Sequence, residues 1–215
     1  MAKHDVISRL LNPGIIAILR ADSSEGLVGA IRACAAGGIV ASEVTMTTPG
    51  ALETIREAAA ELGDAVVMGA GSVLDPETCR SALLAGAQYI VTPVVRPEVI
   101  AMCQRYGAPV ICGAMTPTEA LTAQELGADF VKLFPAEQLG PAMVKALLAP
   151  LPMLRIIPTG GVVPENIAAY VAAGAVAVGA GSQLVSRANV DRGDWPEITR
   201  IAEGYVAAMR KARGE

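Results

Sequence analysis

Apolar runs alternate with amphipathic segments along the whole chain. Eight of these runs have the length and composition of buried β-strands: IIAILR (15–20), IVASEVTM (39–46), AVVMG (65–69), YIVT (89–92), PVICG (109–113), FVKLF (130–134), RIIPT (155–159) and VAVG (176–179). The segments between them place apolar residues three and four positions apart, as a helix does when one of its faces is buried. The pattern therefore predicts eight consecutive strand–helix units.

Turn and capping signals mark the boundaries between these units. TPTE (116–119) supplies the Thr and Glu of a capping box, with proline at the first helical position. Helical segments stop at glycines just before the next strand, as at Gly86, Gly107 and Gly127. Regular alternation implies a parallel sheet, and eight units favour a closed (β/α)8 barrel over an open doubly wound sheet. We expect one α/β barrel domain over residues 1–215, because no linker interrupts the pattern.

Composition and charge narrow the classes of function. No uncharged run approaches the roughly 18 residues of a membrane span, and charges interrupt the start MAKHDVISRLLNPG, where a signal peptide would be apolar. We therefore expect a cytoplasmic protein that is not bound to a membrane. A net charge of −4 and an aromatic content of 3% argue against nucleic acid as a partner.

Metal chemistry is also disfavoured by the residue types present. The only histidine, His4, lies before the first strand, and the four cysteines have no C-x-x-C spacing. A catalytic zinc site needs several His or Cys ligands, so we predict no metal site. Catalysis must then come from lysine, carboxylates, hydroxyls and the backbone.

Two charged residues interrupt the predicted strands. In a barrel, alternate residues of a strand point into the lumen. If Val131 and Leu133 face the helices, Lys132 points inward. By the same alternation Glu43 points inward, together with Ile39, Ala41 and Thr45. The second and sixth strands lie opposite each other, so both charges can occupy one layer of the lumen.

This pair has two interpretations. The structural one is a buried salt bridge, although such pairs add little net stability and apolar replacements are often no worse. The functional one is an amine nucleophile beside a carboxylate that moves protons. An apolar wall lowers the pKa of Lys132, whereas the Glu43 carboxylate raises it, so the two effects oppose each other.

Small and polar residues gather at the carboxyl ends of the predicted strands. PTGGVVPEN (158–166) and VGAGSQL (178–184) supply the seventh and eighth loops, where barrel enzymes commonly bind phosphate. Their glycines also suit the tight turns of this fold, with no ligand at all. Arg20 ends the first strand, next to the second strand, and borders the lumen that holds Glu43. It is either a solvated rim charge or a clamp on a substrate carboxylate.

Several segments, taken together, resemble one known family. SEVTMTTP (42–49), GAGSVL (69–74), GAMTPTE (113–119), VKLFPAE (131–137), PTGGV (158–162) and VGAGSQLV (178–185) resemble bacterial 2-keto-3-deoxy-6-phosphogluconate (KDPG) aldolases. The resemblance runs from about Val6 to Val185 in consistent order. It implies a class I aldolase on a (β/α)8 barrel, usually a homotrimer, that cleaves KDPG to pyruvate and glyceraldehyde 3-phosphate without a cofactor. Many members also accept 4-hydroxy-2-oxoglutarate.

The resemblance also assigns roles to residues. It makes Lys132 the Schiff-base lysine and Glu43 the general acid and base. Ser72, Pro93 and Phe134 would contact pyruvate. The residues assigned to the substrate phosphate are Thr159, Gly160, Gly161, Gly181 and Ser182.

One position departs from the family pattern. Well-known members have an arginine four residues after the glutamate, where it holds the pyruvate carboxylate; this chain has Thr47 there. Another branch of the family also lacks this arginine and ends its first strand with Leu-Arg, as Leu19 and Arg20 do here. We predict that Arg20 takes over the carboxylate, beside Thr47.

Alternative functions remain at this point. One is an aldolase that prefers the galactonate epimer. Another is a different phosphate-binding barrel enzyme, which would share the seventh and eighth loops but would not need Lys132 opposite Glu43. A third is a non-catalytic oligomeric scaffold.

Overall fold

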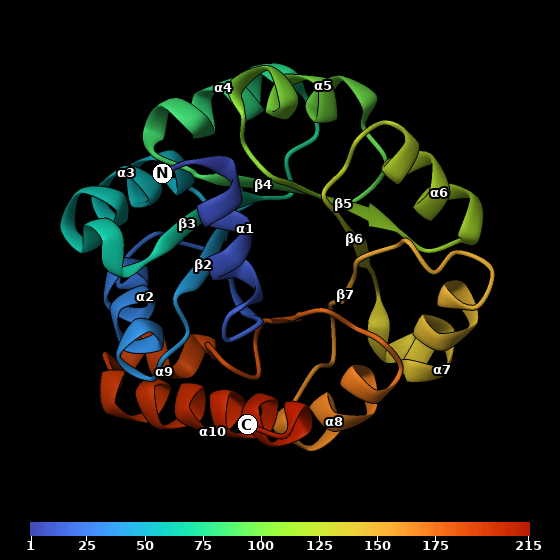
Figure 1. Ribbon diagram of the computed structural model, residues 1–215. Coiled ribbons are helices and arrows are strands. Elements are labelled where there is room, and N and C mark those ends of the chain that lie inside the picture. The colour runs from blue at the N-terminus through green and yellow to red at the C-terminus, as the bar shows by residue number, and fades with distance from the viewer.

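Eight parallel strands curl into a barrel, and helices surround it (Figure 1). The computed structural model describes residues 1–215. The strands are β1 (Ile15–Leu19), β2 (Ala41–Thr45), β3 (Val67–Gly71), β4 (Tyr89–Thr92), β5 (Val110–Ala114), β6 (Phe130–Leu133), β7 (Ile156–Pro158) and β8 (Val178–Ala180). The helices are α1 (Lys3–Leu11), α2 (Leu27–Ala36), α3 (Ala51–Leu62), α4 (Pro76–Ala85), α5 (Pro97–Tyr106), α6 (Pro117–Glu125), α7 (Ala136–Leu148), α8 (Pro164–Ala172), α9 (Arg187–Arg192) and α10 (Trp195–Arg213), with a short 3-10 helix at Gly63–Ala65.

The strands pair in chain order, and β1 also pairs with β8. The circle closes between β7 and β8, where the contact is one bridge from Thr159 to Gly179 and a hydrogen bond of 3.0 Å from Val176 N to Ile156 O. The predicted (β/α)8 barrel is therefore confirmed, and its weakest seam lies between the last two strands.

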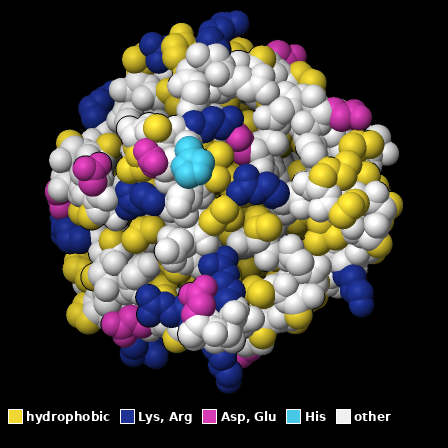
Figure 2. All heavy atoms as spheres, in the orientation of Figure 1, with side chains coloured by type: hydrophobic (Ala, Val, Ile, Leu, Met, Phe, Trp, Pro, Cys, Tyr) yellow, Lys and Arg dark blue, Asp and Glu magenta, His cyan; other side chains and the backbone are white.

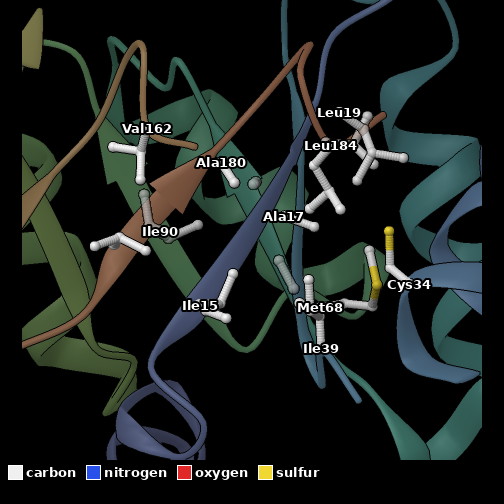
Figure 3. Packing of buried hydrophobic residues seen from close by; sticks show 14 of the residues in the cluster. Ile15, Ala17, Leu19, Cys34, Ile39, Met68, Ile90, Val162, Ala180 and Leu184 are labelled. Atoms are coloured by element: carbon white, nitrogen blue, oxygen red, sulfur yellow. The ribbon is translucent and has the colours of Figure 1, made fainter. Parts of the chain in front are cut away.

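Strand residues alternate between two apolar layers. Side chains that point into the lumen form one buried cluster, which includes Ile16, Val91 and Phe130. Those that point outward pack against the helices in a larger cluster. Figure 3 shows part of this outer layer, where Ala17 and Leu19 of β1 lie on the side of the strand that faces Cys34 of α2. The alternation is what brings polar residues of different strands into one lumen.

Two features differ from the sequence-based expectations. The helix α1 was not predicted; its Val6 and Leu10 join the lumen cluster, so α1 covers the amino-terminal end of the barrel. Ile39 was expected in the lumen but packs in the outer cluster. Its backbone N–H donates to Cys34 O at 2.9 Å, so it lies in the turn that follows α2, and strand alternation begins only at Ala41.

The face of the molecule at the amino-terminal end of the barrel carries no large patch of a single charge. Figure 2 looks onto the end of the barrel that α1 covers and shows Lys and Arg side chains interspersed with Asp and Glu. None of the helices is both long and apolar enough to span a bilayer.

Candidate active site

Lys132 of β6 and Glu43 of β2 share the barrel lumen, as the alternation predicted. Their exposed fractions are 8% and 2%. Both line the same small void on the lumen floor, together with Thr159 and Ile157. No nitrogen–oxygen distance of 4.0 Å or less joins the two side chains, so they do not form a direct salt bridge.

Glycines on β3 make room for the Glu43 carboxyl. A Cβ at Gly71 would lie 2.5 Å from Glu43 Oε1, and one at Gly69 would lie 2.2 Å from the Tyr89 ring. Glu43 Oε1 and the Tyr89 hydroxyl are buried, and neither has a hydrogen-bond partner. Buried polar groups that have no protein partner are uncommon and are found more often at functional sites.

Burial raises the pKa of the Glu43 carboxyl. The positive charges of Lys132 and Arg20 act in the opposite direction, but more weakly. Burial and the Glu43 charge also raise the pKa of Tyr89, so its hydroxyl stays protonated. A carboxylate that binds protons more tightly than usual is a better base for substrate protons.

Above this void, Lys132 also lines a cavity of ≈ 240 Å³ at the carboxyl ends of the strands. Arg20 and Lys132 are the only charged residues of its wall, and the Phe134 ring centre lies 5.4 Å from Lys132 Nζ. The remaining lining residues are Ile18, Thr159, Gly160, Gly161, Val162, Gly181, Ser182, Gln183 and Val185. The structure thus brings both predicted loops, the lysine and Arg20 around one space.

The backbone of the two loops has unused donors. The N–H groups of Gly160, Gly161 and Val162 donate to no protein acceptor, and neither do those of Gly181, Ser182 and Gln183. All six residues line the cavity. Consecutive free amides beside a cation form a site that favours an anion with several oxygens, such as a phosphate.

Three of the predicted pyruvate contacts lie on the same rim but do not line this cavity. Thr47 is exposed, and its hydroxyl lies 3.0 Å from that of Thr45. Ser72 has a φ of 58°, and it is the only residue other than glycine in the left-handed region. Such strain persists where the surrounding structure imposes it and is common at functional sites. Pro93 packs on β5, where a Cβ at Gly113 would lie 2.2 Å from the Pro93 carbonyl.

Sequence reasoning missed several residues of the site. Ile18, Val162, Gln183 and Val185 line the cavity and carried no signal beyond their place at strand ends. Asn166 was part of a quoted motif without an assigned role. Its side chain accepts from Val163 N at 3.0 Å and donates to Gly161 O at 2.9 Å, so it holds the seventh loop. No group of three His, Cys, Asp or Glu side chains is placed to hold a metal ion.

Comparison with protein families gives a decisive match. A family model described as "KDPG and KHG aldolase" matches residues 6–201. The chain belongs to this family. The resemblance noted in the sequence is therefore confirmed, and the chain is a member of a family of aldolases, which are carbon–carbon lyases.

Curated relatives cover nearly the whole chain. The 2-dehydro-3-deoxy-phosphogluconate aldolase of Treponema pallidum is 39% identical over 88% of this chain and 90% of its own length. The 2-dehydro-3-deoxy-6-phosphogalactonate aldolase of Escherichia coli K12 is also 39% identical, over 92% of this chain and 95% of its own length. The two relatives are named for different sugar acids at the same level of identity.

Solved structures agree with this fold. One is KDPG aldolase from Legionella pneumophila, described as having pyruvate captured as a covalent carbinolamine intermediate; its TM-score is 0.83 at 27% identity, covering 89% of this chain and 93% of that one. Another is a protein cage designed by fusing symmetric oligomeric domains, with a TM-score of 0.84 at 36% identity, covering 94% of this chain and 73% of that one.

Proposed function

We propose that this aldolase is a Schiff-base enzyme that cleaves KDPG to pyruvate and glyceraldehyde 3-phosphate, with Lys132 as the nucleophile. The observation that carries the proposal is the geometry of one cavity, in which the Lys132 amine stands at the floor and free loop amides stand at the rim. A keto acid can react at the floor while its terminal phosphate binds at the rim. The relative from Legionella, with pyruvate captured as a carbinolamine, supports the covalent step.

The reaction follows from the positions of the two groups. The neutral amine of Lys132 adds to the C2 carbonyl carbon, and the carbinolamine loses water to give a protonated imine. Glu43 accepts the C4 hydroxyl proton, directly or through water, as the C3–C4 bond breaks and its electron pair moves toward the imine. Glyceraldehyde 3-phosphate leaves. The enamine is protonated at C3, and water hydrolyses the imine, which releases pyruvate and regenerates the lysine. Two side chains and water carry these steps.

The two ends of the substrate need different contacts. We assign the pyruvate half to Arg20, Thr47, Ser72, Pro93 and Phe134. Arg20 is central because a carboxylate in a largely apolar lumen needs a charged partner, and it shares the cavity with Lys132. We assign the phosphate to five residues of the same cavity wall: Thr159, Gly160, Gly161, Gly181 and Ser182. A phosphorylated substrate does not cross membranes unaided, so we place the activity in the cytoplasm.

Borohydride trapping tests the central step. Pyruvate with borohydride should add one reduced pyruvyl group to the protein, on the peptide that contains Lys132. Lys132→Ala and Lys132→Arg should both abolish labelling and cleavage, because neither has an amine nucleophile of suitable basicity. Glu43→Gln should lower turnover by roughly 10²–10⁴-fold while slow labelling persists. Undiminished labelling in Lys132→Ala would show that another residue forms the imine.

A second candidate substrate is the galactonate epimer. The relative from Escherichia coli named for the phosphogalactonate is as similar as the one named for the phosphogluconate, and Thr47 replaces the arginine of the better-known members. We propose KDPG as the main substrate and 4-hydroxy-2-oxoglutarate as a further one. Comparison of kcat/KM for KDPG, its C4 epimer and 4-hydroxy-2-oxoglutarate decides among them, and a higher value for the epimer would reverse the assignment.

We propose that the protein assembles as a homotrimer. Three successive loops, after β3, β4 and β5, each expose about half of a large apolar side chain: Leu74, Val94 and Met115. The similarity to a domain used in a designed symmetric cage supports self-association. Light scattering should give a trimer mass, and Val94→Arg combined with Met115→Arg should shift it to a monomer. An unchanged mass in the double variant would place the interface elsewhere.

A further inference from the structure

The carboxyl-terminal helix α10 contacts the seventh loop through a residue that lies beyond the part of the chain matched by the family model. That match ends at residue 201, while α10 continues to Arg213. Tyr205 of α10 is 1% exposed, and its hydroxyl donates to Val162 O at 2.9 Å across 43 positions of sequence. This contact joins α10 to a residue of the cavity wall.

Because peptide groups are planar, this contact also fixes the direction of the N–H group in the same peptide. In a trans peptide the C=O of one residue and the N–H of the next point in opposite directions. Holding Val162 O at Tyr205 therefore directs Val163 N–H the other way, where it donates to Asn166 Oδ1 at 3.0 Å. Asn166 Nδ2 in turn donates to Gly161 O at 2.9 Å.

The same rule applies one peptide earlier. With Gly161 O held by Asn166, the N–H of Val162 points away from that side chain, and it has no protein acceptor. At the start of the loop, Ala136 N donates to Thr159 O at 2.8 Å, which orients the free N–H of Gly160 in the same manner. The free amides are thus set by donors behind the loop.

We propose that Tyr205 and Asn166 are positioning residues that orient the amides of the seventh loop toward the phosphate of the substrate. The proposal rests on the proposed function, since it deepens the assignment of this loop to phosphate. Neither side chain touches the reacting atoms, so their effect falls on phosphate recognition and not on imine chemistry. Burial raises the pKa of Tyr205 to about 12, so its hydroxyl remains a donor throughout the working pH range.

The test removes single donors and compares two substrates. Tyr205→Phe should raise KM for KDPG about fivefold, the change that corresponds to one hydrogen bond of about 1 kcal/mol. Asn166→Ala removes both contacts and should raise it about tenfold or more. In both variants kcat should stay within about twofold, and KM for unphosphorylated 4-hydroxy-2-oxoglutarate should not change.

The matched control lies on the same helix. Thr199 Oγ1 donates from α10 to Ala33 O of α2 at 3.1 Å, so Thr199→Val also removes one hydroxyl-to-carbonyl bond, but one that does not reach the loop. It should lower stability without separating the two substrates. If Tyr205→Phe behaves like Thr199→Val, or changes KM for both substrates equally, the role is structural and the proposal is wrong.

A second readout separates this proposal from the proposed function. The dissociation constant of inorganic phosphate, measured by calorimetry, should rise in Tyr205→Phe and Asn166→Ala by the same factors as KM for KDPG. This measurement needs no turnover. If wild-type protein fails to trap pyruvate, the Schiff-base assignment fails while the phosphate titration still tests the loop. Phosphate binding that is equal in wild type and variants would overturn the positioning role.

Discussion

The starts of α6 and α8 use the same position of the helix for opposite purposes. Each helix has proline at its first position and a polar residue two places later, Glu119 in α6 and Asn166 in α8. Glu119 Oε2 accepts from the N–H groups of Met115 and Thr116, both at 2.9 Å. The carboxylate thereby consumes the amides of the loop after β5.

Asn166 leaves the amides of its loop free. It accepts only from Val163 N and uses its own N–H to hold Gly161 O. A carboxylate cannot donate, and its charge would repel an anion. We infer from this comparison that the residue at the third helical position helps to set how many amides of a strand-end loop remain free for an anionic ligand.

The largest effect is expected from a substitution that places a carboxylate in the eighth loop, comparable to the Glu119 carboxylate at the start of α6. Gly181 has room for a side chain, since a Cβ there would meet nothing within 4 Å. Gly181→Asp should raise KM for KDPG about 100-fold or more, because like charges at a binding site cost several kcal/mol. Steady-state kinetics with 4-hydroxy-2-oxoglutarate should show a change of less than about threefold.

Gly181→Asn is the control for this variant, because it has the same shape and no charge. Equal damage in Gly181→Asn would show that size, and not charge, excludes the phosphate. Gly161 is unsuitable for the same test. Its φ is +67°, and a Cβ there would lie 2.4 Å from Glu137 Cβ, so any substitution disturbs the loop itself.

A smaller effect is expected from giving α8 the residue type of α6. Asn166→Glu removes the donor to Gly161 O and supplies an acceptor that competes for loop amides. We expect KM for KDPG to rise about 20-fold, roughly the sum of a lost hydrogen bond and a weak repulsion. Asn166→Gln, which keeps both donor and acceptor, should lose only a few-fold. Identical kinetics for Glu and Gln would contradict the role of charge.

The smallest effect on kinetics is expected from a substitution at Glu119 of α6, because the loop that it caps is not assigned to the substrate. Glu119→Gln should leave all kinetic constants unchanged and reduce stability by about 0.5–1 kcal/mol at pH 7. Hydrogen bonds from the backbone of Met115, then from Thr116, lower the pKa of Glu119. Its contribution is therefore present above the ordinary pKa of a glutamate and is lost as pH falls through the lowered value.

Urea unfolding of Glu119→Gln and wild type at several pH values checks this sign. The difference in unfolding free energy should shrink as the solution is acidified below the pKa of Glu119. A difference that persists in acid would mean that the carboxylate charge is not what stabilises this cap.

Most of the barrel could be predicted because its periodicity is local. Strand alternation alone placed Lys132 and Glu43 in one lumen, and both lie there. Alternation failed for Ile39 because that residue lies in the turn after α2, before β2 begins. The helix α1 was missed because only Val6 and Leu10 are buried in it and no capping side chain marks its start.

The rest of the site depends on contacts between distant segments. The orientation of the seventh loop involves partners such as Tyr205, which donates to Val162 O from 43 positions away, and no spacing rule connects those two residues. Thr47, Ser72 and Pro93 were rightly placed at strand ends, but the distance of each from the cavity depends on how its own loop folds. Their roles stay predictions.

The seam of the barrel has a consequence for how a ligand affects motion. The sheet closes through one bridge between Thr159 and Gly179, and these residues lead directly into the two loops assigned to phosphate. Local opening is easiest where backbone pairing is sparsest. If both loops hold the phosphate as proposed, the dianion should fasten the two edges of the sheet together, and hydrogen exchange at the seam should slow when the site is occupied. In such a barrel the bound substrate would supply the connection between β7 and β8 that backbone pairing leaves sparse.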